Sequence, residues 1–145
     1  MAFLEWNDGY SVNVERIDRQ HRRLFELINQ LHETMNEDED RGAGAYLVRE
    51  LDTMAKVLDE LVDYASYHLS TEEKYMLEYE YPDYAKHKEV HGQFLKKAQA
   101  LKGDFDNGRA VFPEEILEFL KDWWSNHVLT VDRKYSTFFN AKGLT

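Results

Sequence analysis

Apolar residues recur in alternating steps of three and four over four long segments of this 145-residue chain. In the second segment, for example, the series runs through Leu47, Leu51, Met54, Leu58 and Leu61. An α-helix has about 3.6 residues per turn, so such a series lies along one face of a helix that packs against a core. The pattern predicts four helices, over about residues 18–37, 45–79, 83–103 and 113–139.

Turn-forming and capping residues separate these segments. Asp18 and Asp83 are suited to cap the first and third helices. The acidic, glycine-containing run 36–44 divides the first two helices, and Pro113 with the acids after it fits the first turn of the fourth. Residues 1–16 are rich in apolar side chains without helical spacing, which predicts an irregular arm packed onto the body of the domain.

Four amphipathic helices with short connections favour an antiparallel arrangement. The expected fold class is therefore all-α, an antiparallel up-down-up-down four-helix bundle preceded by an N-terminal irregular arm. The length fits one domain, over residues 1–145, that is large enough to bury a core.

The composition narrows the classes of function. A formal net charge of −10 argues against nucleic acids and anionic membranes as partners, because both attract basic surfaces. The absence of cysteine excludes disulfides, iron–sulfur clusters and cysteine nucleophiles. No apolar run is long enough to span a bilayer, and the N-terminus lacks a basic region followed by an apolar one. We therefore expect a cytoplasmic protein without membrane insertion, and a monomer.

Five of the six histidines and two acidic residues fall on or beside the predicted buried faces. In the second and third helices they come in pairs four residues apart, so both members of a pair can reach one ion. In an antiparallel bundle, the start of the first helix, the end of the second, the start of the third and the later part of the fourth lie at one end. Seven side chains are expected to meet there: His21, His68, Glu72, His87, His91, His127 and Asp132.

A metal site has to be weighed against separate local explanations. A single histidine on an apolar face is more often a hydrogen-bonded core residue than a ligand, and Glu72 could form a structural ion pair. Buried without partners, each polar group costs roughly 1–3 kcal/mol, and an unpaired charge costs more. A shared metal satisfies all these nitrogens and oxygens together, which favours the metal site. His32 lies beside the apolar stripe and far from this level, and we interpret it as a surface histidine.

The donor set indicates two ions, because five imidazoles and two carboxylates exceed what one ion accepts. Nitrogen and oxygen donors without sulfur suit iron, manganese or zinc. If both carboxylates bridge together with an oxide or hydroxide, a single octahedral position stays open. The first two helices supply only two histidines, so the open position belongs to the two-histidine ion and suits one small ligand.

Asp132 is the donor that a regular helix would misplace. It follows His127 by five residues, which turns it about 140° around the helix axis, whereas Val131 continues the apolar stripe. We therefore expect Asp132 to bridge from the flank, helped by a local widening of the helix.

With these positions in order, the chain resembles the hemerythrin family, and in particular its single-domain bacterial members. The likeness covers nearly the whole chain, and besides the seven donors it rests on Trp6, Ile17, Asp18, Glu73, Trp123 and Tyr135. The resemblance implies a non-haem di-iron centre that binds dioxygen reversibly. It implies that one iron is held by His87, His91 and His127 and the other by His21 and His68, with Glu72, Asp132 and an oxide or hydroxide as bridges.

The residues expected around the open position depart from the usual pattern of that family. Leu69 stands where phenylalanine is common, Trp124 where leucine is common, and Val128 where isoleucine is common. With Leu24, these three are expected to line the ligand pocket and to alter its shape. Trp124 is equally compatible with a packing role outside the pocket.

The function expected from the residues and the resemblance is reversible dioxygen binding, for oxygen carriage, storage, delivery or scavenging, with azide and other small anions as analogues. Such a protein is not an enzyme. The alternatives are a di-iron oxidase, peroxidase or nitric-oxide-handling activity, an oxygen- or redox-sensing module, and a metal-free structural bundle. The Glu-x-x-His pairs of carboxylate-rich oxygen-activating enzymes and the His-Glu-x-x-His motif are both absent, which favours binding over catalysis.

Overall fold

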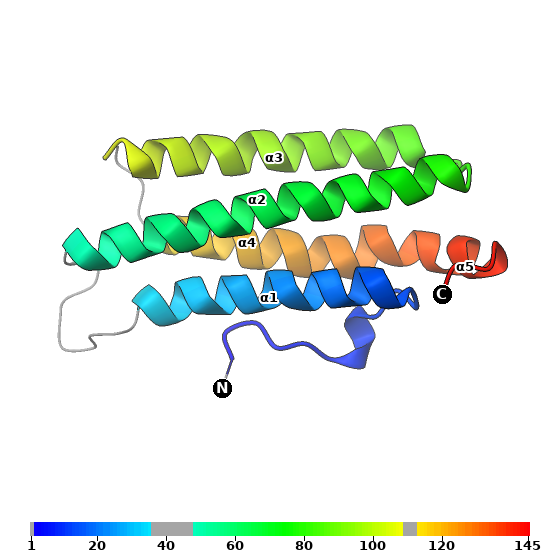
Figure 1. Ribbon diagram of the computed structural model, residues 1–145, viewed down its shortest axis with the longest axis horizontal. Helices are drawn as coiled ribbons and strands as arrows, with labels where there is room; N and C mark the ends of the chain where they lie inside the picture. The colour runs from blue at the N-terminus through cyan, green and yellow to red at the C-terminus, as the bar shows by residue number, and fades with distance from the viewer. Residues whose placement is uncertain (1, 36–47, 109–112) are drawn as a thin grey trace.

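Four helical rods lie side by side and form the whole body of the molecule (Figure 1). The structure is a computed structural model, and it describes residues 2–35, 48–108 and 113–145. The first three rods are α1 (Glu15–Met35), α2 (Val48–Glu78) and α3 (Tyr84–Asp106). The fourth rod is continuous and consists of α4 (Pro113–Asn126), a π-helical segment η2 (His127–Asp132) and α5 (Arg133–Ala141). The chain direction alternates from rod to rod, which confirms the predicted antiparallel bundle.

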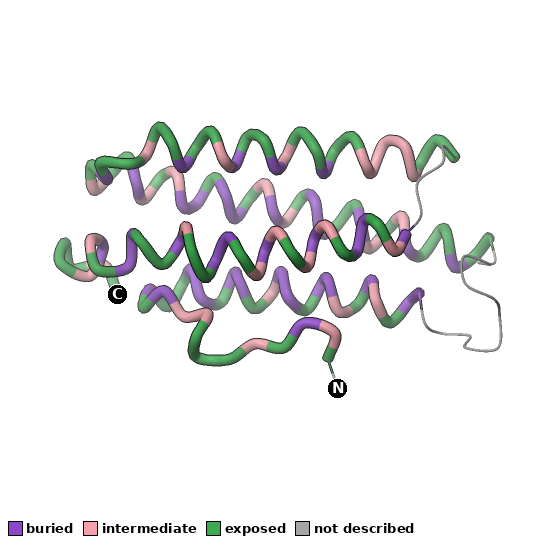
Figure 2. The backbone as a smooth tube through the Cα atoms, turned by 180° about the vertical axis from the view of Figure 1, so that it is seen from behind, coloured by how far each residue is buried: buried purple, intermediate pink, exposed green. Residues whose placement is uncertain are grey.

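The rods turn their apolar stripes inward, and buried positions recur along the facing sides of each helix (Figure 2). The larger apolar cluster fills the end of the bundle where α1 finishes and α2 begins, around Leu31, Met54 and Leu58. A smaller cluster at the opposite end contains Ile17 and Tyr135. On every rod the predicted donor residues lie near the boundary between the positions that feed these two clusters. The donors therefore form a polar layer between two apolar ones.

The irregular arm packs onto α1 as expected. Its one regular turn is the 3₁₀ helix η1 (Asp8–Tyr10). The backbone N–H of Leu4 donates to Asn29 Oδ1 at 2.8 Å, and Asn29 Nδ2 donates back to the Leu4 carbonyl at 2.9 Å. These two reciprocal bonds pair the extended arm with a single side chain of α1 and bury Leu4.

Two expectations about single residues are corrected by the structure. Asp18 is not the N-cap of the first helix, because α1 begins three residues earlier, at Glu15. Its carboxylate instead accepts hydrogen bonds from the Val12 N–H at 2.9 Å and the Ser11 hydroxyl at 2.6 Å, so it fixes the arm. His32 is half-buried rather than a surface residue, because the ring of Phe3 from the arm stacks on it with centroids 4.3 Å apart.

The other helix boundaries differ from the predicted ones by a few residues. Asp83 takes the N-cap position of α3, as expected, but its side chain makes no capping hydrogen bond. Helix α3 ends at residue 106 and α5 at residue 141, and both ends lie beyond the predicted ones at 103 and 139. The predicted helix end at 37, the run 36–44 and the predicted start at 45 lie outside the described residues. No helix in the described part of the chain is long and apolar enough to cross a membrane.

Candidate metal centre

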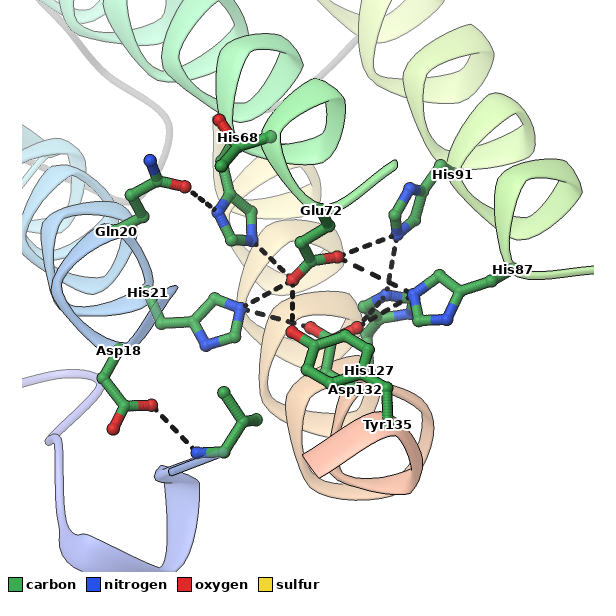
Figure 3. Close-up of polar contacts among 12 residues, drawn as sticks. Asp18, Gln20, His21, His68, Glu72, His87, His91, His127, Asp132 and Tyr135 are labelled. Atoms are coloured by element: carbon green, nitrogen blue, oxygen red, sulfur yellow. Dashed lines mark hydrogen bonds and ion pairs between the residues drawn. The ribbon is translucent and has the colours of Figure 1, made fainter. Parts of the chain in front are cut away.

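The four rods deliver all seven predicted donors to one buried cluster (Figure 3). None of the seven is more than 4 % exposed. They come from α1 (His21), α2 (His68, Glu72), α3 (His87, His91) and the fourth rod (His127, Asp132). The predicted convergence at one level of the bundle is therefore what the structure shows.

All five imidazoles turn Nε2 toward the two carboxylates. His68 Nε2 lies 2.9 Å from Glu72 Oε1, and His91 Nε2 lies 3.3 Å from Glu72 Oε2. The distances from Nε2 to the nearest oxygen of Asp132 are 3.2 Å for His21, 3.0 Å for His87 and 2.9 Å for His127. The carboxylates thus form the middle of the cluster, and the imidazoles surround them.

The geometry divides the donors into two sets that share both carboxylates. One set joins three histidines, His87, His91 and His127, with Glu72 and Asp132, and the other joins His21 and His68 with the same two acids. Within each set the donor atoms lie within 4.8 Å of one another. Two cations could therefore sit side by side with Glu72 and Asp132 between them, which is the division expected from the sequence.

The π-helical segment explains how Asp132 reaches the cluster. In a π-helix the hydrogen bonds run between residues five apart, so such residues come to lie on one face. His127 and Asp132 are the first and last residues of η2, and both point inward. Val131, which would continue the stripe of a regular helix, is only half-buried. The local widening predicted for this turn is confirmed.

Outer hydrogen bonds orient several of the donors. Gln20 Oε1 lies 2.6 Å from His68 Nδ1, and Glu73 Oε2 lies 3.0 Å from His91 Nδ1. An acceptor at Nδ1 holds the ring proton there and leaves the Nε2 lone pair facing the cluster, as a metal ligand requires. The Tyr135 hydroxyl donates to Glu72 Oε1 at 2.8 Å, so this carboxylate is also oriented.

Gln20 was not singled out from the sequence, although a signal was present. It lies three residues after Ile17 and four before Leu24, so it is a polar residue on an otherwise apolar stripe. Glu73 and Tyr135 were noted only through the family resemblance. Their contacts with His91 and Glu72 give each a physical role in the cluster.

In the absence of a metal, the cluster shifts the pKa values of its members in different directions. Burial lowers the pKa of His21, but the carboxylates of Asp132 and Glu72 beside its Nε2 outweigh burial and raise the pKa from 6.5 to about 9. The same balance raises the pKa of His87 to about 9. Burial lowers the pKa of His68. Burial also opposes ionisation of Glu72, yet the neighbouring histidines hold the pKa of this carboxyl well below its usual value.

Hydrogen bonds within the cluster leave much of it unsatisfied. The buried atoms without a hydrogen bond include Nε2 of His68 and His87, Oε2 of Glu72 and both carboxylate oxygens of Asp132. His91 Nε2 and His127 Nε2 face each other at 3.2 Å, where one proton at most can lie between them. Cations placed among these atoms would satisfy them, so the residues fit a pair of metal ions with nitrogen and oxygen ligands.

The four predicted pocket residues lie together beside the cluster. Leu24, Leu69, Trp124 and Val128 are at most 1 % exposed and belong to the larger apolar cluster. The ring of Trp124 lies 5.7 Å from that of His68 and 6.4 Å from that of His127, so it is nearer to the two-histidine set, and its indole N–H is buried without a hydrogen-bond partner. Trp123 contacts the other set instead, stacked on His127 with centroids 4.2 Å apart.

Comparisons with known proteins agree with this geometry. The family model of the hemerythrin HHE cation binding domain matches residues 12–139. The chain belongs to the hemerythrin family. It is 33% identical to the bacteriohemerythrin of Stenotrophomonas maltophilia over 136 residues, which cover 94% of this chain and 81% of the relative. It is 30% identical to the bacteriohemerythrin of Clostridium acetobutylicum, over 90% of this chain and 96% of the relative.

A solved structure gives the same result for the fold. The crystal structure of wild-type hemerythrin superimposes with a TM-score of 0.81 at 30% identity, covering 94% of this chain and 97% of that one. This chain is thus a hemerythrin-family four-helix bundle whose buried histidine and carboxylate cluster is able to hold a metal.

Proposed function

We propose that this hemerythrin-family protein binds dioxygen reversibly at a pair of iron ions. The observation that carries the proposal is the division of the donors into two sets that share Glu72 and Asp132 but differ by one histidine. The set with three histidines would supply one more ligand than the other set. An ion held by the two-histidine set would therefore have room for a small molecule.

Each side chain of the cluster would have a separate role as a metal ligand. His87, His91 and His127 would hold one iron, His21 and His68 the other, and Glu72 and Asp132 would bridge, with an oxide or hydroxide between the ions. When bound, the iron pair supplies the open position and the electrons that dioxygen binding requires.

Water exclusion around the open position supports reversible binding over turnover. Leu24, Leu69, Trp124 and Val128 are buried apolar residues, and Trp124 lies beside His68, so apolar surface on this side would slow the access of water and acids. Tyr135 contacts the cluster, but burial and the charges of Asp132 and Glu72 raise its pKa well above 10, so it is a poor proton donor. We infer that the protein is a carrier or store of dioxygen and not an enzyme.

Metal analysis with absorption spectroscopy is the first test. The purified protein should hold two irons per chain and show a ligand-to-metal charge-transfer band that changes when azide is added. The residues that make up the two sets predict this stoichiometry. A preparation with one zinc and no iron would reject the di-iron centre.

Stopped-flow mixing then separates a carrier from an enzyme. The reduced protein mixed with dioxygen should form a stable complex, which reverts to the reduced protein when dioxygen is removed. Rapid peroxide release with turnover, or consumption of nitric oxide, would assign the protein to the oxidase, peroxidase or nitric-oxide-handling class. We also propose that it works as a monomer in the cytoplasm, which light scattering on the purified protein and cell fractionation test.

A further inference from the structure

A second polar site lies outside the metal centre, in a hollow of about 620 Å³ between α1 and α2. Arg16 of α1 and Tyr67, Ser70, Lys74 and Tyr75 of α2 line it. Tyr67, Ser70 and Lys74 follow one another at steps of three and four, and Tyr75 is next to Lys74, so these residues lie along one side of α2. The hollow therefore rests on two rigid helices.

Two tyrosines hold the Arg16 guanidinium in place. One terminal nitrogen of Arg16 donates to the Tyr75 hydroxyl at 3.2 Å, and the other donates to the Tyr67 hydroxyl at 3.3 Å. The guanidinium carries five N–H groups, so these contacts leave three for another acceptor. Both phenol oxygens accept from Arg16, so their own protons are available to donate as well.

Among the residues that the structure describes, the two cations of this hollow have no ion-pair partner, in contrast to Arg23 of α1 and Lys102 of α3. Arg23 pairs with Glu26 and Glu60, and Lys102 of α3 pairs with Asp59 of α2. In the described part of the chain neither Arg16 nor Lys74 forms an ion pair. Arg16 and Lys74 therefore place two cations that pair with no described carboxylate beside one hollow, which favours the approach of an anion even in a chain whose net charge is −10.

The donors are spread around the hollow, which selects the shape of the ligand. They are the free N–H groups of Arg16, the ammonium of Lys74 and the hydroxyls of Tyr67, Ser70 and Tyr75. A planar carboxylate is bound by one bidentate donor, whereas a tetrahedral oxyanion presents oxygen atoms in several directions. Donors on several sides of the hollow therefore favour the tetrahedral oxyanion. Glu78 is the acidic residue of the lining, so positive charge exceeds negative charge by one.

We propose that the hollow between α1 and α2 binds a phosphoryl group, as free phosphate or as part of a small phosphorylated molecule. Arg16 and Lys74 supply the charge, and the tyrosine and serine hydroxyls complete the hydrogen bonds. The proposal is independent of the metal centre, because none of the seven donors lines the hollow.

Isothermal titration calorimetry with inorganic phosphate tests the site on the metal-loaded protein at constant ionic strength. One phosphate should bind per chain, and Arg16→Gln and Lys74→Gln should each weaken binding at least tenfold. Arg23→Gln is the matched control, because Arg23 lies on the same helix but is already paired with Glu60. This control should bind phosphate within twofold of the unmodified protein.

Several other outcomes would overturn the proposal, and one would identify a larger ligand. Absence of binding by the unmodified protein, or equal affinity in Arg16→Gln and Lys74→Gln, would show that the hollow holds no phosphoryl group. Displacement of the bound phosphate by an equal concentration of chloride would show that the hollow attracts anions without selectivity. Binding that survives Arg16→Gln and shifts the iron absorption spectrum would place phosphate at the metal centre instead. A phosphorylated small molecule that binds more tightly than phosphate, and loses that affinity in Arg16→Gln, would identify the larger ligand as the occupant.

Discussion

The same four rods build two very different layers, the large apolar cluster at one end and the donor cluster next to it. Around Leu31 and Leu58, side chains pack on each other and need no other partner. In the adjacent layer, His68, Glu72 and Asp132 are equally buried, yet several of their nitrogen and oxygen atoms make no hydrogen bond. The first layer is complete as a protein core, whereas the second is complete only with cations.

The difference teaches where the stability of the bundle comes from. Burial of apolar area stabilises the first layer at about 25 cal/mol per Å², whatever is bound elsewhere. In the donor layer each buried unsatisfied polar group costs about 1–3 kcal/mol, so without metal this layer opposes folding. Metal loading should therefore act on the donor layer much more than on the larger apolar cluster.

Removal of the metal is expected to have the largest effect. Treatment with a chelator should lower the Tm by more than about 10 °C, because the free energy of metal binding contributes to the free energy of folding. Amide exchange should become faster around His68 and Glu72, while amides near Leu31 keep their protection. Restoring iron(II) should reverse both changes. Uniform loss of protection along all four rods would contradict the division into two layers.

Single substitutions in the two layers should separate metal content from stability. His91→Leu removes one ligand of the three-histidine set, so the bound metal should fall well below two ions per chain. Leu58→Ala, at an equally buried site of the apolar layer, should cost about 2–5 kcal/mol but leave the metal content unchanged. Metal analysis and urea unfolding of both variants test this pair. Full metal content in His91→Leu would remove that residue from the ligand set.

The pH dependence should distinguish the metal-free protein from the loaded one. His21 and His87 each have a pKa of about 9 in the folded, metal-free protein, against 6.5 as the ordinary value. Protonated histidine then stabilises the fold fully below pH 6.5, and this stability is lost as the pH rises toward 9 and above, on the order of 3 kcal/mol for each residue.

Unfolding of both forms between pH 6.5 and 9.5 measures the effect. Metal bound at Nε2 excludes the proton, so the loaded protein should show little dependence over the same range. A metal-free protein that becomes more stable as the pH rises would contradict the assignment of these charges.

Much of this could be predicted from the sequence because the decisive features are periodic. The three-and-four spacing predicts the rods, and the positions of the histidines along antiparallel rods predict their common level. Even the widened turn follows from periodicity, since Asp132 lies five residues after His127 and a regular helix would turn it away.

The two predictions that were wrong, for Asp18 and His32, concern residues that contact the irregular arm. Asp18 accepts hydrogen bonds from Ser11 and Val12, and His32 stacks on Phe3. An arm without helical spacing has no period from which such contacts could be derived. Gln20 was missed for another reason, because its partner His68 lies on a different rod and only the assembled bundle brings them together.

Removal of the outer hydrogen bonds should have a smaller effect than loss of a ligand. Gln20→Leu leaves the Nδ1 proton of His68 buried without an acceptor, so affinity for one of the two ions should fall about 10- to 100-fold. Glu73→Gln keeps an oxygen for His91 at a partly exposed position, and should cost less. Competition with a chelator measures both. A larger loss in Glu73→Gln would show that charge matters more here than the hydrogen bond.

Substitution at the ligand pocket should have the smallest effect on the metal and a selective effect on the ligand. Trp124 is fully buried beside His68, whereas Trp123 stacks on His127 of the other set. Trp124→Leu enlarges the space beside the two-histidine ion, so azide should bind about tenfold faster, with two irons per chain retained. Trp123→Phe is the matched control, and it should leave azide binding unchanged because it alters the three-histidine side. If Trp123→Phe changes azide binding and Trp124→Leu does not, the open position belongs to the ion held by His127.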